Sequence, residues 1–258
     1  MAKLLIGTSG WTYASWKRTF YPPDLPSRRY LGFYAREFPT TEVNYSFYHL
    51  PKPSTYENWG RQVPKDFVFA VKASRFITHI KRLQDVDEAW HTFVHNARYL
   101  GRHLGPILLQ FPPSARCDVT RLKRFLTVSQ PAEKTAIPLR LVFEFRHDSW
   151  FTDRVYRLLN QYQAALCIAD SARYARRDVI TSDFAYLRFH GPQELFSSKY
   201  PDEQLAKEAR TIRKYVRSGL DVYVFFNNDA LGHAIENASA LRTMVEGGVH
   251  HSTRKAGK

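Results

Sequence analysis

Eight short apolar runs recur along the chain, and seven of them end on a charged or amide side chain just before a loop. Residues 67–71, for example, stop at Lys72, and residues 107–109 stop at Gln110. A charge buried in a strand without a partner is costly, so such regular placement indicates one shared site. The polar residues at these ends are Ser9, Glu42, Asn44, Lys72, Gln110, Glu144, Arg146, Asp170, Arg188, His190 and Asn227.

Segments with helical periodicity separate the apolar runs, and four of them begin at a residue whose side chain can cap a helix. The predicted caps are Ser27 before 28–37, Asp85 with Glu88 before a helix that ends at Gly101 or Gly105, Asp118 before 119–128, and Thr152 before 153–162. Two further helices are predicted over residues 202–218 and 231–245.

The repeated alternation of strand and helix predicts parallel strands joined by right-handed crossovers. Eight such units in about 250 residues fit a closed (β/α)₈ TIM barrel, whose functional groups lie at the C-terminal ends of the strands. A doubly wound open sheet is the alternative, but GTSGW after the first run is not the glycine-rich phosphate turn of that fold. We therefore predict one α/β barrel of eight parallel strands over residues 1–246, followed by a loose basic tail over 247–258.

The spacing of the polar residues supports a common direction for their side chains. Three pairs lie two positions apart, namely Glu42 with Asn44, Glu144 with Arg146, and Arg188 with His190. Side chains alternate between the two faces of a strand, so the members of each pair point the same way. In a barrel we expect that direction to be inward, at the mouth.

The charge balance favours polyanionic partners. The chain has 38 Lys and Arg against 24 Asp and Glu, which gives a net charge of +14 and a pI near 9.8. Such a protein attracts polyanions, nucleic acid among them. The helix predicted over 202–218 carries a basic stripe beside its apolar face, although a solvated outer helix of a barrel has the same pattern. The stripe consists of Lys207, Arg210, Lys214 and Arg217.

Other features of the composition bear on location. No apolar run approaches the roughly 18 residues of a membrane span, so no membrane partner is expected. The N-terminus enters a short strand directly, without a secretory apolar segment, which predicts a cytoplasmic protein. Cys117 and Cys167 are too few and too far apart for a metal knuckle, and in a reducing compartment we expect unpaired thiols.

Eight motifs, in order, are similar to those of one known family. They are IGTSGWTYASW at 6–16, FYPPDLP at 20–26, TTEVNYSFYHLP at 40–51, FAVKASRFITH at 69–79, GPILLQFPPS at 105–114, FEFRHDSW at 143–150, LRFHG at 187–191 and FFNND at 225–229. From about residue 4 to 245 the chain thus resembles the YecE-like family, also called domain of unknown function 72. The resemblance implies a TIM barrel and implies no established reaction. Ser46, where the family commonly has Thr, is a mild departure.

The first kind of site that fits these residues binds an anion. Arg146 and Arg188 would clamp a phosphate or carboxylate, with Lys72 and the nearby Arg75 adding positive charge. Glu144 and His190 would then be the acid/base candidates. In the competing interpretation, Arg–Glu pairs neutralise each other across the barrel and only seal its mouth.

The second kind of site binds a metal. Glu42, Glu144, Asp170 and His190 are suitable ligands, and metal-dependent barrels such as endonuclease IV and xylose isomerase use similar sets. The neighbouring cations would repel a divalent ion, and neither H-x-H nor H-E-x-x-H spacing occurs. A divalent metal is therefore disfavoured, and the sequence leaves the cofactor unidentified.

The third kind of site is a stacking surface for bases or sugar rings. Aromatic residues are concentrated in the loops after the first two strands and after Glu144. Packing over the barrel explains most of them. Trp11 and Trp150 lie beside polar strand ends, so they are the predicted stacking residues.

We predict a barrel-mouth site that binds, and in the extended hypothesis hydrolyses, a phosphate-bearing ligand such as nucleic acid. Lys72, Arg146 and Arg188 hold the phosphate, Glu42 or Glu144 is the base, and His190 is the acid. The other ligand contacts are Ser9, Trp11, Asn44, Arg75, Gln110, Trp150, Asp170 and Asn227. One alternative is an acid/base enzyme acting on a small carbohydrate-like substrate, with Glu42 and Glu144 as paired carboxylates. Another is a non-catalytic ligand-binding protein.

Overall fold

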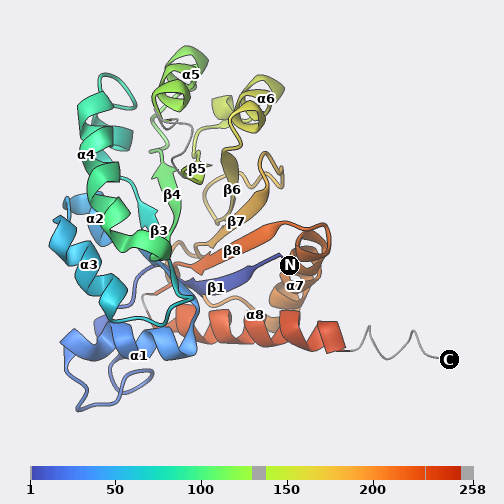
Figure 1. Ribbon diagram of the computed structural model, residues 1–258. Helices are drawn as coiled ribbons and strands as arrows, with labels where there is room; N and C mark the ends of the chain where they lie inside the picture. Colours follow the sequence, from blue (N-terminus) through green and yellow to red (C-terminus); the bar gives the residue numbers. More distant parts are fainter. Residues whose placement is uncertain (1, 130–137, 230, 251–258) are drawn as a thin grey trace.

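The computed structural model describes residues 2–129, 138–229 and 231–250, and within them eight parallel strands close into a barrel (Figure 1). The strands are β1 (Leu4–Thr8), β2 (Thr40–Val43), β3 (Val68–Lys72), β4 (Leu104–Gln110), β5 (Leu141–Glu144), β6 (Ala165–Asp170), β7 (Phe184–Phe189) and β8 (Asp221–Phe226). Each pairs with its neighbours in chain order, and β1 closes on β8 from Leu4 opposite Val222 to Thr8 opposite Phe226. The predicted (β/α)₈ barrel is confirmed.

Helices surround the barrel and connect its strands (Figure 1). The α-helices are α1 (Tyr30–Glu37), α2 (Tyr45–Tyr48), α3 (Pro53–Arg61), α4 (Asp87–Ala97), α5 (Val119–Val128), α6 (Asp153–Gln161), α7 (Asp202–Arg217) and α8 (His233–His250). Shorter 3₁₀ turns occupy Ala14–Trp16, Ser27–Arg29, Arg98–His103 and Asp148–Trp150, and a π-helical turn occupies Phe76–Ile80. Residues 171–183, between β6 and β7, are all described and form no helix.

Two of the four predicted helix caps are confirmed, and two were wrong. Asp118 and Thr152 each accept a hydrogen bond from a backbone N–H in the first turn of their helix, at 2.9 and 3.4 Å. Ser27 lies inside a 3₁₀ turn instead of before it. Asp85 has a φ of 48°, and this left-handed conformation is incompatible with the extended backbone of a cap.

The last helix is longer than its pattern predicted. We expected it to end at Val245, but α8 continues to His250. It therefore includes the first four residues of the predicted loose tail, and residues 251–258 lie outside the described residues.

Strand side chains divide between two apolar layers. One layer fills the barrel and includes Leu5, Ala70, Leu108, Val142, Cys167, Tyr186 and Phe225. The other lies between barrel and helices and includes Ile6, Val71, Ile107, Phe143, Ile168, Leu187 and Val224. Because side chains alternate along each strand, these two sets fix which residues beyond the strand ends point into the mouth.

Two further predictions from the sequence agree with the structure. The basic residues Lys207, Arg210, Lys214 and Arg217 are all exposed on α7. Cys117 and Cys167 are both free thiols, the second of them inside the barrel. None of the helices in the described part of the chain has the length and hydropathy to cross a membrane.

Candidate functional site

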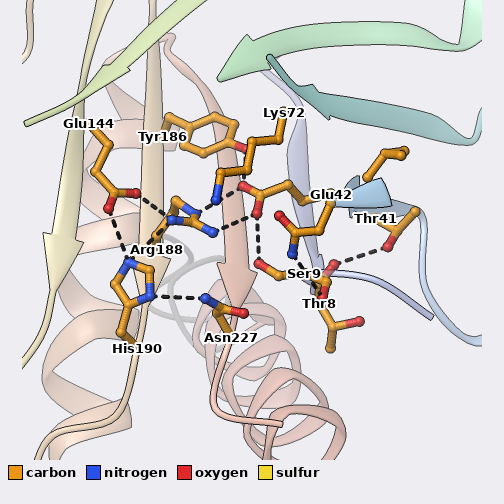
Figure 2. A network of polar contacts seen from close by, with 12 residues as sticks. Thr8, Ser9, Thr41, Glu42, Lys72, Glu144, Tyr186, Arg188, His190 and Asn227 are labelled. Atoms are coloured by element: carbon orange, nitrogen blue, oxygen red, sulfur yellow. Dashed lines mark hydrogen bonds and ion pairs between the residues drawn. The ribbon is translucent and has the colours of Figure 1, made fainter. Parts of the chain in front are cut away.

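Four polar residues from three strands meet at the C-terminal mouth of the barrel (Figure 2). Glu42 comes from β2, Glu144 from β5, and Arg188 with the following His190 from β7. Each is at most 1% exposed. These four side chains are therefore the floor of the mouth, covered from solvent, and we call them the floor below.

Arg188 is the centre of the floor and binds both carboxylates. Its Nη2 and Nε lie 2.7 and 3.0 Å from the two carboxylate oxygens of Glu42, and its Nη1 donates to Oε2 of Glu144 (Figure 2). Glu42 also accepts hydrogen bonds from the hydroxyls of Tyr186 at 2.6 Å and Ser9 at 2.9 Å. The predicted role of Arg188 as a phosphate clamp does not fit these contacts, and the sealing interpretation does.

Glu144 contacts three residues, namely Arg188, Arg146 and His190. Its Oε1 accepts a hydrogen bond from Nε of Arg146 at 2.8 Å and lies 3.6 Å from Nε2 of His190. The other ring nitrogen of His190, Nδ1, lies 3.1 Å from the side-chain amide nitrogen of Asn227 (Figure 2). The Nε2 atom also lies 3.3 Å from Nη1 of Arg188, so this nitrogen faces both a guanidinium donor and the carboxylate of Glu144.

Burial and ion pairing fix the charges of the floor. Burial by itself raises the pKa of a carboxyl group, but Arg188 outweighs it and holds the pKa of Glu42 and of Glu144 below the ordinary value. Burial and the charge of Arg188 lower the pKa of His190, so its imidazole is neutral at pH 7. The two negative charges of the floor carboxylates thus balance the positive charges of Arg188 and Arg146. The floor together with Arg146 is therefore electrically neutral.

Above the floor lies a pocket of about 440 Å³, a volume typical of small-molecule sites. It is lined by Tyr13, Asn44, Phe47, Tyr48, Lys72, His79, Gln110, Arg146, Phe196 and Asn227. The structure therefore brings together five predicted ligand contacts on the pocket wall. They are Asn44, Lys72, Gln110, Arg146 and Asn227.

Arg146 and Lys72 are the cations of this wall. Arg146 uses Nε on Glu144, and its two Nη nitrogens bond to no residue within the described ranges, while its guanidinium lies 4.8 Å from the ring centre of Tyr174. The Nζ of Lys72 lies 4.1 Å from the ring centre of Phe47. Burial and the charge of Arg188 lower the pKa of Lys72 to about 7.

The amides of the wall are held through their nitrogens. Nδ2 of Asn44 donates to the carbonyl of Ser9 at 3.4 Å, and Nε2 of Gln110 donates to the carbonyl of Phe111 at 2.8 Å. The side-chain oxygen of Asn44 is buried and has no hydrogen-bond partner among the described residues.

Asp170 belongs to the outer face of the barrel and not to the mouth. Cys167 and Ala169 point into the barrel, so the side chain of Asp170 points away from it. Its carboxylate accepts hydrogen bonds from the hydroxyl of Tyr200 at 2.7 Å and from Arg176 at 3.1 Å. Its predicted contact with the ligand does not fit this position.

Trp150 is part of the core instead of a stacking surface. It is 3% exposed, its ring stacks on Phe145 at 4.2 Å, and its Nε1 donates to the carbonyl of Ala115 at 2.7 Å. Trp11 packs edge-on against Trp59 at 5.4 Å and lines a neighbouring pocket. Arg75 is exposed after the end of β3 and does not line the pocket above the floor.

Several residues of the pocket were not among the predicted site residues. His79 reaches it because the π-helical turn Phe76–Ile80 turns the chain back after β3, and Phe196 reaches it from the loop after His190. Gly191, with a φ of 107°, starts that loop, and a Cβ there would meet the carbonyl of Glu194 at 2.3 Å. Irregular loops have no periodic pattern, so the sequence carries little signal for such residues. The one signal in the sequence was the concentration of aromatic residues in the loops after the first two strands, to which Tyr13 belongs.

Asp229 is a second unusual group beside the mouth. It follows β8, is 6% exposed, and neither carboxyl oxygen has a hydrogen-bond partner among the described residues. Tyr13 lies nearby but donates its hydroxyl proton to the carbonyl of Ser9. Burial raises the pKa of Asp229 well above its ordinary value. The group is therefore held as a neutral acid in the folded protein over a range of pH where a free aspartate is charged.

Metal ligands do not gather at the mouth. Over residues 2–129, 138–229 and 231–250, no three His, Cys, Asp or Glu side chains are placed to hold a metal ion. The two carboxylates of the floor instead bind arginine.

A closed barrel of eight parallel strands, with polar residues concentrated at its C-terminal mouth, defines a (β/α)₈ barrel protein. A sequence model described as "Protein of unknown function DUF72" matches residues 5–257, and the chain belongs to this family. The family resemblance of the eight motifs is confirmed.

Three relatives illustrate the similarity. The UPF0759 protein YunF of Bacillus subtilis (strain 168) is 26% identical over 274 residues, covering 94% of this chain and 95% of YunF. A DUF72 family protein from Thermotoga maritima MSB8 has a TM-score of 0.84 at 28% identity, over 95% of this chain and 99% of that one. Another from Enterococcus faecalis V583 has a TM-score of 0.80 at 20% identity, over 94% and 95% of the two chains. These similarities establish fold and family and name no ligand or reaction.

Proposed function

We propose that the barrel mouth binds a small ligand through a phosphate or carboxylate group. The observation that carries this proposal is the state of Arg146. Glu144 fixes the guanidinium through Nε, while both Nη nitrogens lack partners within the described residues. A guanidinium held in this way can bind two oxygens of an oxyanion side by side. Lys72 on the same wall adds a second donor.

The exposure of the charged groups supports an anionic ligand. Glu42 and Glu144 are 0% exposed, so an entering ligand meets Arg146, Lys72 and neutral amides instead of carboxylates. The same burial argues against hydrolysis, because Glu42, Glu144 and His190 do not reach a ligand in the pocket. It argues equally against Glu42 and Glu144 as paired carboxylates flanking a sugar ring.

The rest of the pocket suits a ligand with hydroxyl groups and a ring. Amide side chains of the wall can bond to hydroxyls, and the rings of Tyr48 and Phe196 are 65% and 38% exposed at its edge. A sugar phosphate or a single nucleotide combines these features. Nucleic acid would enter through a terminal phosphate, or would bind the basic stripe on α7 instead. A cytoplasmic location stays a prediction from the sequence.

Calorimetric titration with inorganic phosphate, glucose 6-phosphate and glucose tests this proposal. We expect glucose 6-phosphate to bind more tightly than either of the other two. Arg146→Gln should weaken binding of the phosphorylated probe roughly tenfold or more, because a hydrogen bond to a charged group contributes about 1.5–3 kcal/mol. The matched control is Arg210→Gln, which removes the same charge from the exposed surface of α7.

Equal binding by the wild type and Arg146→Gln, with both proteins folded, would contradict the proposal. A labelled single-stranded oligonucleotide provides a further comparison across a salt series. If Arg146→Gln weakens its binding, the polyanion enters the mouth. If only Arg210→Gln weakens it, nucleic acid binds α7 and the mouth has another ligand.

A further inference from the structure

Lys72 lines the pocket without the ion pair that usually accompanies a lysine away from solvent. Its Nζ forms no hydrogen bond or ion pair with any residue that the structure describes, and it lies over the ring of Phe47 at 4.1 Å. Lysine side chains are seldom buried unless they are paired. The side chain nevertheless lines the pocket, and Figure 2 shows it beside Arg188 and Glu42 of the floor. The half-buried amine is thus unpaired within the described residues and faces the pocket.

The charged groups around Lys72 come from four elements. Burial and the positive charges of Arg188 and Arg146 lower its pKa, whereas Glu42 and Glu144 raise it, and the balance is a pKa of about 7. His79, on the turn after β3, is neutral at that pH because burial and the charge of Lys72 lower its own pKa to about 4. A substantial fraction of the amine is therefore unprotonated near neutrality. Desolvation and a neighbouring cation are the two ways by which proteins make a lysine nucleophilic.

We propose that Lys72 is the nucleophile of the pocket and forms an imine with a small aldehyde or ketone that carries a phosphate or carboxylate. The neutral Nζ adds its lone pair to the carbonyl carbon and gives a carbinolamine. The carbonyl oxygen then leaves as water with both hydrogens of the amine, and a carbon–nitrogen double bond forms. This inference rests on the proposed function, because the anionic group of the ligand binds Arg146 while the carbonyl lies at Lys72.

Borohydride trapping tests the proposal. The full chain is incubated with dihydroxyacetone phosphate, or with dihydroxyacetone as the matched probe without the anionic group, and sodium borohydride is added. Hydride reduces any imine to a secondary amine, which peptide mass mapping locates. At pH 7 we expect Lys72 to be labelled roughly tenfold or more faster than the exposed Lys207, because an ordinary lysine of pKa about 10.4 is almost wholly protonated. The phosphorylated probe should label Lys72 at lower concentration than the neutral probe.

Two variants control for location. Lys72→Arg keeps the positive charge but cannot form an imine, so it should abolish labelling at this position. Lys207→Arg should leave labelling of Lys72 unchanged. Trace acetylation by acetic anhydride across a pH series measures amine reactivity without depending on the probe. We expect the acetylation rate of Lys72 to rise through a midpoint near pH 7.

The outcomes separate this inference from the proposed function. If labelling is confined to surface lysines, or if Lys72 is acetylated no faster than Lys207, the imine proposal is overturned, and phosphate binding that depends on Arg146 would still stand. If Lys72 is labelled equally by both probes and Arg146→Gln changes nothing, the anion site is overturned and the nucleophilic amine stands.

Discussion

Arg188 binds Glu42 across the barrel, with two nitrogens 2.7 and 3.0 Å from the two carboxylate oxygens. The partners come from β7 and β2, which are separated in the barrel by β8 and β1. The contact therefore crosses the lumen instead of joining adjacent strands. It pairs two charges that are each at most 1% exposed and leaves Arg146 and Lys72 to face a ligand.

Replacing the central arginine should cost a large part of the stability. Arg188→Met leaves Glu42 and Glu144 buried without their cation, so we expect the free energy of unfolding to fall by about 3–5 kcal/mol. Urea denaturation measures it. Adding Glu42→Gln and Glu144→Gln to Arg188→Met should recover much of the loss. A triple variant no more stable than Arg188→Met would show that the carboxylate charges are not the cause.

Acid should weaken the folded protein through the same two carboxyl groups. Their pKa values are lower in the folded state than the ordinary value of 4.5, so the folded protein binds fewer protons than the unfolded chain. This contribution to stability is present above pH 4.5 and is lost as the pH falls below it. Urea denaturation from pH 7 to pH 3 should show a shallower decline for Glu144→Gln. The exposed Glu88→Gln on α4 is the control and should decline like the wild type.

Asp229 should act in the opposite direction. Its pKa is raised in the folded state, so the unfolded chain releases this proton at lower pH than the folded protein does. Stability is fully present below about pH 3.8 and is progressively lost as the pH rises from there to the folded pKa. Asp229→Asn removes this penalty, and we expect a gain of about 1–3 kcal/mol at pH 7. Thermal unfolding at pH 4 and pH 7 measures it, and a loss at pH 7 would mean that the carboxylate has a stabilising partner.

Trp150 should matter for stability and not for binding. Truncating a buried aromatic residue costs about 3–5 kcal/mol, so Trp150→Ala should unfold at clearly lower denaturant concentration. Trp150→Phe, which keeps most of the packing against Phe145, is the milder variant for binding assays. It should bind glucose 6-phosphate like the wild type. A marked loss of affinity in this folded variant would show that Trp150 contributes to ligand binding.

Apolar periodicity was enough to predict the barrel, because eight buried strands in regular alternation admit few other folds. The same regularity located the mouth. It did not settle which face of β6 points inward, since the small residues Cys167 and Ala169 fill the barrel while the bulkier Leu166 and Ile168 pack outward. Asp170 was therefore assigned to the mouth wrongly.

Residue type alone could not separate the buried charges from the accessible ones. Arg146 and Arg188 have the same chemistry in the sequence, yet one lines the pocket and the other is enclosed by two carboxylates. That difference depends on contacts between distant strands. The predicted cap at Asp85 failed for a local reason, because its left-handed backbone depends on packing that a short motif does not record.

The contacts of Arg188 also bear on how the barrel is made. The chain emerges with β2 and β5 before β7, so both glutamates exist before the residue that neutralises them. An assembly that stops after six strands would leave Glu42 without Arg188 and Glu144 with Arg146 alone, which is unfavourable wherever these carboxylates are buried. Electrostatics therefore destabilises such partial barrels, in addition to the unpaired backbone groups at their open edges. The ion pairs of the mouth thus form only once the seventh strand is present, and the eighth strand then closes the barrel.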